Sequence, residues 1–544
     1  MTNDTDGFSV EIPHSWSSHE NYAFRILHRL SRTPDYDVLH WRGRDTTSGL
    51  LAAQVMKAAE VFLRCAAEKS RTIAVLTSSN HPAMLVSRYA AHLVGAGVVY
   101  IRAANPRTDA DMLPHRVQSR ILAETGACVL VVDAPHIDRG RSLAASAATP
   151  LTLVTADADV PDAQPLYSGR PARPSALPAY DPARRAIVTF TSGSTGQPKS
   201  LAQSFRTWNA TVAAFPGRND PERPGRILAV TPVSHTVGSM VDSVLAGGGR
   251  AVLHEGFDAA AVLRAFAGHR IEDVYLAVPH LYRLIDHEDT ARTDLSSLRR
   301  LIYSGTPAAP HRIAGAVRLF GDAVIQLYGT TEAGGISSLT PLDHREPELL
   351  PTVGRPFPWV RVRICDPRTG AEVDRGRVGE VWTRSATLMD GYLGDTGCAD
   401  DVLVDGWLRT GDLGHFDRYG YLRLVGRVGQ VIKAGGQKVY PAAVESALLT
   451  HPEVRQAVVF GVQDPDRVEH VHAAVALTVG STVTDAELRS HVTAALNPAH
   501  APARFSRWAE IPLTAYGKPD RVSLRSRADG EPAVSRTAQR GTAA

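Results

Sequence analysis

Cysteine is scarce in this sequence of 544 residues. The chain has only four, and none of them forms a Cys-x-x-Cys pair or another spacing typical of zinc ligands. A disulfide-stabilised secreted fold and a cysteine-based metal centre are therefore not indicated, and we expect a reduced protein in the cytoplasm. The four cysteines are Cys65, Cys128, Cys365 and Cys398.

The sequence also lacks a basic block, a long hydrophobic run and a leader-like start. The net charge is +3, without the clustered Lys and Arg of a nucleic-acid surface. No run approaches the roughly 18 apolar residues that span a bilayer. Residues 1–16 do not show the basic and then apolar order of a signal peptide. We expect no nucleic-acid partner and no membrane span, and the oligomeric state stays open.

What the sequence does contain is a repeated order of short apolar strands and helices. Residues 72–76 (TIAVL) predict a buried strand, and HPAMLVSRYAAHLVGAG predicts a helix that Gly95 and Gly97 stop. Strand, helix and strand at short intervals are typical of parallel βαβ units, so we expect an α/β fold. Further strands are predicted at VVYI (98–101), at 128–135, at 186–190 and in RILAV, VYLAV and LRRLIYSG.

Changes in composition divide the chain. Prolines recur between residues 150 and 182 and predict an irregular surface connection. Short strands and turns over about 355–425 predict a β-rich subdomain within a large domain of βαβ layers, residues 1–426. A small C-terminal α+β domain is expected over 427–528, and the polar tail 529–544 is expected to be disordered.

A stretch rich in hydroxyls and glycines, TFTSGSTGQPKS, spans Thr189–Ser200. It is not a Walker A loop, because Gln and Pro separate Gly196 from Lys199. Gly193 and Gly196 still allow backbone N–H groups to turn toward an anion, so a phosphate-binding loop is one interpretation. Taken alone, the stretch is equally typical of a solvated turn. The side chains that can supply donors or charge are Thr191, Ser192, Ser194, Thr195 and Lys199.

Five further motifs follow this loop in the chain. Together with it, they resemble the acyl-adenylate-forming (AMP-binding) enzyme superfamily, and most of all its AMP-forming acyl-CoA synthetases. The resemblance extends over residues 45–525, in the order of the family. The motifs are TSGSTGQPK (191–199), QLYGTTE (326–332), VGE (378–380), WLRTGD (407–412), GRVGQVIKAGGQKV (426–439) and PLTAYGKPDR (512–521).

The resemblance implies a reaction in two steps. A carboxylate attacks the α-phosphate of MgATP, which gives acyl-AMP and pyrophosphate. The thiol of coenzyme A, or of a carrier-protein pantetheine, then attacks the acyl-AMP and releases AMP. The implied cofactors are therefore ATP, Mg²⁺ and coenzyme A.

The resemblance also assigns residues to the nucleotide. It implies that Tyr328 stacks on adenine, that Thr331 bonds the α-phosphate and that Glu332 holds Mg²⁺, a cation that prefers carboxylate oxygen. It implies contacts to the ribose from Asp412 and Arg427. The other nucleotide-binding residues implied are Thr191, Ser192, Gly193, Ser194, Thr195, Gly196, Lys199, Ser304, Gly305, Thr306, Gly329 and Thr330.

Lys518 resembles the lysine that reaches from the small domain to the acyl carboxylate and the α-phosphate. With Thr331 and Glu332 it completes the implied catalytic set. An ammonium fixed at that position would stabilise the charge that builds in the transition state. Without the other motifs, Lys518 would be an exposed lysine near the end of the chain.

The acid is less closely defined. Members of the family that activate amino acids usually carry an Asp in the region of His235, and TPVSHTVGSM lacks that pattern, although Asp242 lies nearby. We therefore expect a simple carboxylic acid. The presumed lining is rich in small residues, which favours a bulky or long apolar acid. The implied substrate-binding residues are His235, Val237, Gly238 and Gly334, and His235 could equally be a structural histidine.

The hinge motif departs from the family. Gly429 stands where an Asp is usual, and glycine should rotate freely there. Gly436 keeps the pattern of the loop that lines the pantetheine tunnel, so we expect a thioester with CoA. The alternative is an acyl-AMP ligase that passes its adenylate to a carrier protein or a partner enzyme.

Two interpretations from other classes stay open. A non-catalytic nucleotide-binding module would predict damage at Lys518, Glu332 or the loop, and these residues are intact. An oxygenase of the luciferase kind would share the fold, but no residue indicates oxidation. A single ligase of this kind suits fatty-acid metabolism or natural-product biosynthesis.

Overall fold

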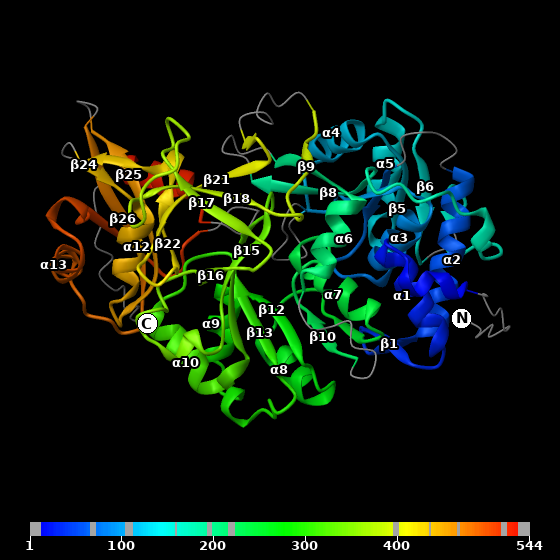
Figure 1. Cartoon of the computed structure of the whole chain (residues 1–544), viewed down its shortest axis with the longest axis horizontal. Coiled ribbons are helices and arrows are strands. Elements are labelled where there is room, and N and C mark those ends of the chain that lie inside the picture. The colour runs from blue at the N-terminus through cyan, green and yellow to red at the C-terminus, as the bar shows by residue number, and fades with distance from the viewer. Residues whose placement is uncertain are drawn as a thin grey trace, which may run out of the picture.

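A computed structural model describes residues 12–65, 72–103, 112–157, 160–192, 198–215, 224–394, 402–434, 437–464, 468–512 and 519–530. Within these residues the strands form sheets of nine, eight, five, three and two strands (Figure 1). No helix in this part of the chain combines the length and the apolarity that a membrane crossing requires.

The eight-stranded sheet forms around the first predicted strand. This strand, β3 (Thr72–Leu76), pairs in parallel with β4 (Gly97–Tyr100) on one side and with β5 (Ala127–Val132) on the other. Its residues alternate, so that Ile73 and Val75 pack into one hydrophobic cluster and Ala74 and Leu76 into another. In spatial order the strands are β19 (Gly391–Tyr392), β9 (Pro198–Ser204), β8 (Arg185–Ser192), β4 (Gly97–Tyr100), β3 (Thr72–Leu76), β5 (Ala127–Val132), β6 (Thr152–Thr155) and β7 (Gln164–Pro165).

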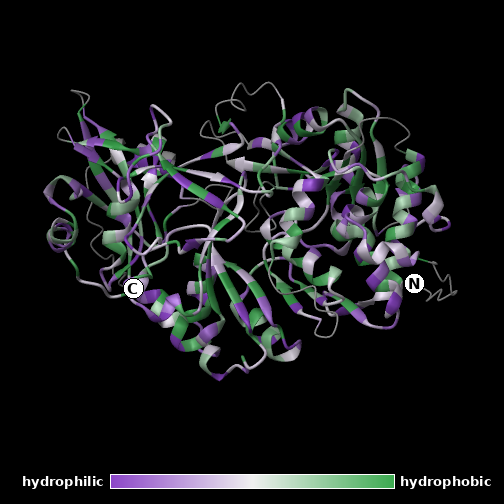
Figure 2. Cartoon of the chain, viewed as in Figure 1, coloured by the Kyte–Doolittle hydropathy of each residue, from purple (hydrophilic) through white to green (hydrophobic). Residues whose placement is uncertain are grey.

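The nine-stranded sheet is parallel through its centre and antiparallel at its ends. Figure 2 shows its central strands, β12 and β13, as largely hydrophobic. In spatial order the strands are β16 (Arg355–Pro356), β15 (Gly334–Leu339), β14 (Val324–Thr330), β13 (Arg300–Ser304), β12 (Asp273–Ala277), β10 (Arg226–Ala229), β11 (Arg250–Leu253), β1 (Asp37–Trp41) and β2 (Arg44–Thr47).

Helices fill the space between the two large sheets and cover their outer faces. One hydrophobic cluster contains residues of both sheets and of the helices between them. These helices are α1 (Tyr22–Arg32), α2 (Ser48–Cys65), α3 (Pro82–Leu93), α6 (Phe205–Ala213) and α7 (Thr236–Ala246). The outer helices are α4 (His115–Thr125) and α5 (Ile137–Ser146) on one sheet, and α8 (Ala259–Gly268), α9 (Val278–Ile285) and α10 (Pro310–Phe320) on the other.

A third sheet confirms the predicted β-rich region. It shares a hydrophobic cluster with Tyr328 of β14 and Leu201 of β9, so it packs where the two large sheets approach each other. Its strands are β17 (Arg361–Cys365), β18 (Gly379–Arg384), β20 (Leu403–Val404), β21 (Trp407–Phe416) and β22 (Leu422–Arg427).

The C-terminal part of the chain forms a small α+β unit, which lies at the left of Figure 1. The expected domain boundary at residue 427 falls at the end of β22, and the division into two domains stays a prediction. The elements that follow are β23 (Ile432–Ala434), β24 (Gln437–Val439), α12 (Pro441–Leu449), β25 (Val454–Gln463), β26 (Glu469–Leu477), α13 (Asp485–Ala495), β27 (Arg504–Trp508) and α14 (Arg521–Gly530).

Two local expectations need correction. The proline-rich stretch is not a wholly irregular connection, because β6 and β7 add two parallel strands to the eight-stranded sheet. Thr152–Thr155 contains no proline, and Pro165 lies in the outermost strand, where a missing N–H breaks no ladder. At the C-terminus, α14 continues to Gly530, inside the segment expected to be disordered, and residues 531–544 lie outside the described ones.

Candidate active site

The predicted site residues gather at the carboxyl ends of parallel strands. His235 follows β10, Ser304 ends β13, and Tyr328 lies near the end of β14. In open parallel sheets these ends form the crevice that binds ligands. The fold therefore brings together segments that are about one hundred residues apart in the sequence.

Asp412 is the centre of the first group. The Tyr328 hydroxyl donates to its Oδ2 at 2.7 Å, and the Arg427 Nε donates to its Oδ1 at 2.7 Å. These three residues come from β14, β21 and β22, and β21 pairs Asp412 directly with Arg427. The structure thus joins the residues predicted to contact adenine and ribose.

The two side chains that donate to Asp412 have raised pKa values. Burial and the neighbouring Asp412 raise the pKa of Tyr328 well above its usual value. The phenol therefore stays protonated and can donate a hydrogen bond to Asp412. Burial opposes the charge of Arg427, but the Asp412 carboxylate outweighs it and the pKa of Arg427 is raised. Asp412 is accordingly held by a permanent neutral donor and a permanent cation.

Glu332 is the centre of the second group. The Tyr392 hydroxyl donates to its Oε1 at 3.0 Å, and the Tyr392 ring lies 5.4 Å from the Lys199 Nζ. Tyr392 is in β19, which pairs with β9, the strand that carries Lys199. A half-buried carboxylate at the end of β14 suits Mg²⁺, which is usually held by one or two carboxylates together with substrate phosphates. Glu332 is the residue that would hold it.

Two neighbouring threonines at the turn after β14, Thr330 and Thr331, have different surroundings. Thr330 Oγ1 accepts the N–H of Ala333 at 3.1 Å, so this side chain stabilises the turn itself. Thr331 is exposed. Its predicted bond to the α-phosphate requires such an exposed hydroxyl, and that role stays a prediction.

Several predicted residues lie outside the described ones. Thr191 pairs with Lys199 in the register of β8 and β9. The backbone of Ser192 is described, but its side chain is not. The residues whose placement is not described are Gly193, Ser194, Thr195, Gly196, Gly436 and Lys518.

On the acid side, His235 occupies the N-cap position of α7. Its Nδ1 donates to the carbonyl of Ser234 at 3.0 Å, and its side chain is half-buried. Nearby, burial raises the pKa of Tyr275 of β12, and the neighbouring side chains of Ser304 and Thr236 oppose that rise. This tyrosine links the start of α7 to the end of β13, and it was missed at the sequence level.

Val237 and Gly238 are buried in the helical layer. A Cβ on Gly238 would lie 2.0 Å from the Val233 carbonyl oxygen and 3.1 Å from Arg88 Nη1. Gly329 is restricted in the same way, because an added Cβ would lie 2.2 Å from the Gly334 oxygen. Close backbone packing therefore accounts for these glycines, and they do not by themselves indicate a roomy pocket.

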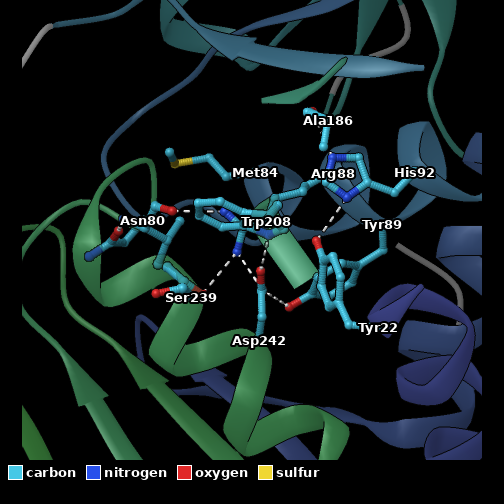
Figure 3. Close-up of polar contacts among 12 residues, drawn as sticks. Tyr22, Asn80, Met84, Arg88, Tyr89, His92, Ala186, Trp208, Ser239 and Asp242 are labelled. Carbon is cyan, nitrogen blue, oxygen red and sulfur yellow. Dashed lines mark hydrogen bonds and ion pairs between the residues drawn. The ribbon is translucent and has the colours of Figure 1, made fainter. Parts of the chain in front are cut away.

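Asp242 is fully buried, and its carboxylate belongs to a network of hydrogen bonds (Figure 3). Arg88 Nη2 and the Tyr89 hydroxyl donate to its Oδ1 at 2.6 and 2.8 Å, and Trp208 Nε1 donates to its Oδ2 at 3.2 Å. Arg88 also donates to the Val233 carbonyl at 2.8 Å. Asp242 thus serves as the counter-ion of Arg88, which holds the segment before His235.

The hinge candidate Gly429 lies in a 3-10 turn, Val428–Gln430. An added Cβ there would meet no atom within 4 Å. Nothing in the local packing therefore requires glycine at this position.

The C-terminal part contacts the large region next to the adenine-side loop. Ala309 is fully buried in the same hydrophobic cluster as Val444 and Leu448 of α12. The N–H of Ala309 donates to the Tyr282 hydroxyl at 2.6 Å. The loop Ser304–Pro307 is therefore continuous with the surface on which α12 packs.

Tyr392 and Tyr275 are two residues near the candidate site that the sequence did not predict. Neither stands in a motif that indicates chemistry. Tyr392 reaches Glu332 only because β19 pairs with β9, strands almost two hundred residues apart. No local signal predicts such a contact.

Comparison with known families supports the geometry. Residues 26–393 match the family model described as AMP-binding enzyme, and residues 443–518 match the one described as AMP-binding enzyme C-terminal domain. The first match covers most of the chain and contains the Tyr328 and Glu332 turn.

Curated relatives are CoA ligases and synthases. The medium/long-chain-fatty-acid–CoA ligase FadD8 of Mycobacterium tuberculosis is 35% identical over 351 residues, which is 62% of this chain and 61% of that protein. The chain therefore spans less than two thirds of that relative's length. Feruloyl-CoA synthase of Amycolatopsis sp. is 31% identical over 92% of this chain and 98% of that protein.

Among solved structures, the amide bond synthetase McbA from Marinactinospora thermotolerans is similar over most of its length. It has a TM-score of 0.82 and 34% sequence identity, and the match covers 93% of this chain and 99% of that one.

Proposed function

We propose that this chain, which belongs to the AMP-binding enzyme family, activates a carboxylic acid with ATP to an acyl adenylate and then transfers the acyl group to coenzyme A. The first step releases pyrophosphate and the second releases AMP. Similarity to CoA ligases and synthases supports the choice of coenzyme A.

The observation that carries the proposal is the convergence of Tyr328 and Arg427 on the Asp412 carboxylate. A carboxylate fixed between a phenol and a guanidinium is a rigid acceptor for the two hydroxyls of a ribose. Because Tyr328 and Arg427 hold it in advance, little ordering remains when the nucleotide binds.

Charge is the main obstacle to the chemistry. A carboxylate has to approach an anionic phosphate, so cations and hydrogen-bond donors must be fixed near the reacting atoms. Lys199, exposed Thr331 and Lys518 would supply them. Glu332, oriented by Tyr392, would hold Mg²⁺, which neutralises charge on the phosphates when bound.

For the acid we propose a bulky or long apolar carboxylic acid without an ammonium group. The names of the relatives, a medium- and long-chain fatty acid ligase and a feruloyl-CoA synthase, support this class. Asp242 supports it too, since Arg88 already neutralises that carboxylate. His235, Thr236 and Tyr275 are the residues we expect at the pocket.

A second candidate keeps the adenylation and changes the acceptor. The acyl group would go to an amine, to a carrier protein or to a partner enzyme. Two observations favour it: Gly429 replaces the usual acidic hinge residue, and the chain is 34% identical to an amide bond synthetase.

The test is a mass-spectrometric assay with MgATP and a panel of carboxylic acids, run with CoA, with an amine and with neither. Acyl-CoA as the product supports the first candidate, and an amide supports the second. Acyl-AMP that accumulates whatever the acceptor points to a partner protein. An absence of acid-dependent AMP formation across the panel would contradict the adenylation itself.

Lys518→Ala separates the two half-reactions. We expect adenylation to fall by about two to three orders of magnitude, because a donor to the transition-state charge is lost. Transfer from supplied acyl-AMP should stay near the wild-type rate. Equal loss of both steps would refute the role of Lys518, and Arg504→Ala is the control, at an exposed cation of the same part of the chain that lies outside the motifs.

A further inference from the structure

Glu380 belongs to a sequence motif to which no role has been assigned so far. Its side chain is almost completely buried, at 4% exposure. A buried carboxylate is unfavourable unless donors satisfy it. The contacts of Glu380 therefore indicate what it is there to hold.

The two carboxylate oxygens face different partners. Oε2 accepts Trp382 Nε1 at 3.1 Å and Arg409 Nε at 3.0 Å. Oε1 accepts the backbone N–H of Gly411 at 3.2 Å. One oxygen is thus anchored within the β-rich sheet, and the other reaches the residue directly before Asp412.

The backbone at Gly411 needs such an anchor. Its φ of +71° lies in the left-handed region, at a register shift between β18 and β21. Thr410 adds two bonds: its Oγ1 donates to the Val381 carbonyl at 2.7 Å and accepts the Asp412 N–H at 3.1 Å. Two of these bonds, to Glu380 and to the Val381 carbonyl, therefore anchor the segment before Asp412 to β18.

The partners of Glu380 are themselves fixed. The guanidinium of Arg363 lies 4.7 Å from the Trp382 ring and 4.3 Å from the Trp407 ring, and Arg409 lies over Trp382 at 5.4 Å. This stack of cations and indoles keeps the donors of Glu380 in place. It thereby fixes Oε2 of Glu380, the oxygen that does not contact Gly411.

We propose that Glu380 is a positioning residue for the nucleotide ribose, acting through the Gly411 N–H and the Thr410–Asp412 turn. The proposal rests on the proposed function, in which Asp412 accepts the ribose hydroxyls. Tyr328 and Arg427 bind the two oxygens of the Asp412 carboxylate, and Glu380 fixes the backbone one residue earlier, at Gly411.

The test compares ATP with 2′-deoxy-ATP and 3′-deoxy-ATP in wild type and in Glu380→Gln. Glutamine keeps the shape, but one of its N–H groups must face the Gly411, Trp382 or Arg409 donors. We expect kcat/KM for ATP to fall about tenfold, the effect of one lost charge-assisted hydrogen bond. The KM for the acid should stay unchanged.

The decisive result is how the two losses combine. If Glu380 acts through Asp412, removing a ribose hydroxyl should cost Glu380→Gln clearly less than it costs wild type. If the loss in kcat/KM caused by Glu380→Gln and the loss caused by the missing ribose hydroxyl simply multiply, Glu380 does not act on the ribose and the inference is overturned. Asp258→Asn is the matched control, because Asp258 also accepts a backbone N–H group, that of Ala261, at the start of α8 and outside the β-rich sheet.

A second pair of variants covers the case in which Glu380→Gln does not fold. Thr410→Val removes the hydroxyl that holds the same turn, and Thr410→Ser keeps it. We expect the valine variant alone to show the reduced penalty for deoxynucleotides, and equal penalties in both would contradict the inference. Calorimetric titration with AMP and with 2′-deoxy-AMP repeats the comparison without turnover, so an inactive wild type would refute only the proposed function.

Discussion

Tyr392 links two functional groups through a single side chain. Its hydroxyl orients the Glu332 carboxylate and its ring lies beside the Lys199 ammonium. Groups that orient a metal ligand typically change metal affinity 10- to 100-fold when they are removed. Under the proposed function, in which Glu332 holds Mg²⁺, we therefore expect Tyr392 to contribute to metal binding.

Tyr392→Phe should raise the Mg²⁺ concentration for half-maximal activity about tenfold, because the ring stays and only the hydroxyl is lost. Electron paramagnetic resonance of Mn²⁺ with ATP present would measure the same loss as weaker metal binding. Tyr419→Phe is the control, at a tyrosine that is 59% exposed. Unchanged metal dependence in Tyr392→Phe would contradict the role.

At the residue scale, the sequence predicted Tyr328, Asp412 and Arg427 as nucleotide-binding residues but not the hydrogen bonds among them, and it missed Tyr392 beside Glu332. Asp412 and Arg427 stand in motifs whose order in the chain is informative. Tyr392 and Tyr275 stand outside the motifs. Glu380 stands in one of them, but nothing in that motif reveals its bond to Gly411. Gly238 was expected at the substrate, but its packing against Val233 already accounts for a glycine there.

At the scale of elements, α3 is the helix on which the site segment rests. Arg88 of α3 holds the backbone before His235, and His92 of the same helix connects α1 to β8. The Tyr22 hydroxyl donates to His92 Nδ1 at 3.0 Å, and His92 Nε2 donates to the Ala186 carbonyl at 2.8 Å. Burial lowers the pKa of His92 to about 3.

This buried histidine makes the helical layer sensitive to acid. Its folded-state pKa lies below the unfolded value of about 6.5, so the unfolded chain binds the extra proton as the pH falls. The stability that neutral His92 contributes is present above pH 6.5 and is lost between about pH 6.5 and 3.

His92→Gln should reduce this acid sensitivity. Between pH 7 and pH 5 the variant should lose about 2 kcal/mol less unfolding free energy than wild type. Urea denaturation at the two pH values measures the difference. His470→Gln, at a half-exposed histidine, is the control, and an identical pH response in His92→Gln and wild type would show that His92 does not contribute.

The elements themselves were largely predictable. β3, β5, β8 and α12 follow from apolar runs and from the glycines or prolines beside them. β6 and β7 were missed because prolines surround them, although an outer strand tolerates proline. The antiparallel additions β9 and β19 could not be predicted, because only the finished sheet provides the edge on which they pair.

At the scale of the whole molecule, the two parts of the chain meet at β22 and continue through the turn that contains Gly429. No packing constraint requires glycine there, since an added Cβ meets no atom within 4 Å. The family resemblance predicts that the C-terminal part reorients at this point between the two half-reactions.

Gly429→Asp should therefore leave adenylation within about twofold of wild type, because a surface substitution without strain usually changes little. The rate of acyl transfer to the acceptor should change. Pyrophosphate exchange measures the first step, and single-turnover transfer from acyl-AMP measures the second. Gly256→Asp is the control, at another glycine with open space, and a fall in adenylation would contradict the hinge assignment.

The short segment Ser304–Ala309 connects both parts of the molecule, since it begins at the end of β13, where the nucleotide is expected, and ends in the hydrophobic cluster of α12. A mutation that adapts its first residues to a new acid will also disturb the surface on which the C-terminal part packs. Substrate preference and the timing of domain movement are thus expected to evolve together at this segment. Directed evolution toward other acids should keep Ala309 unchanged and diversify the start of α7 instead.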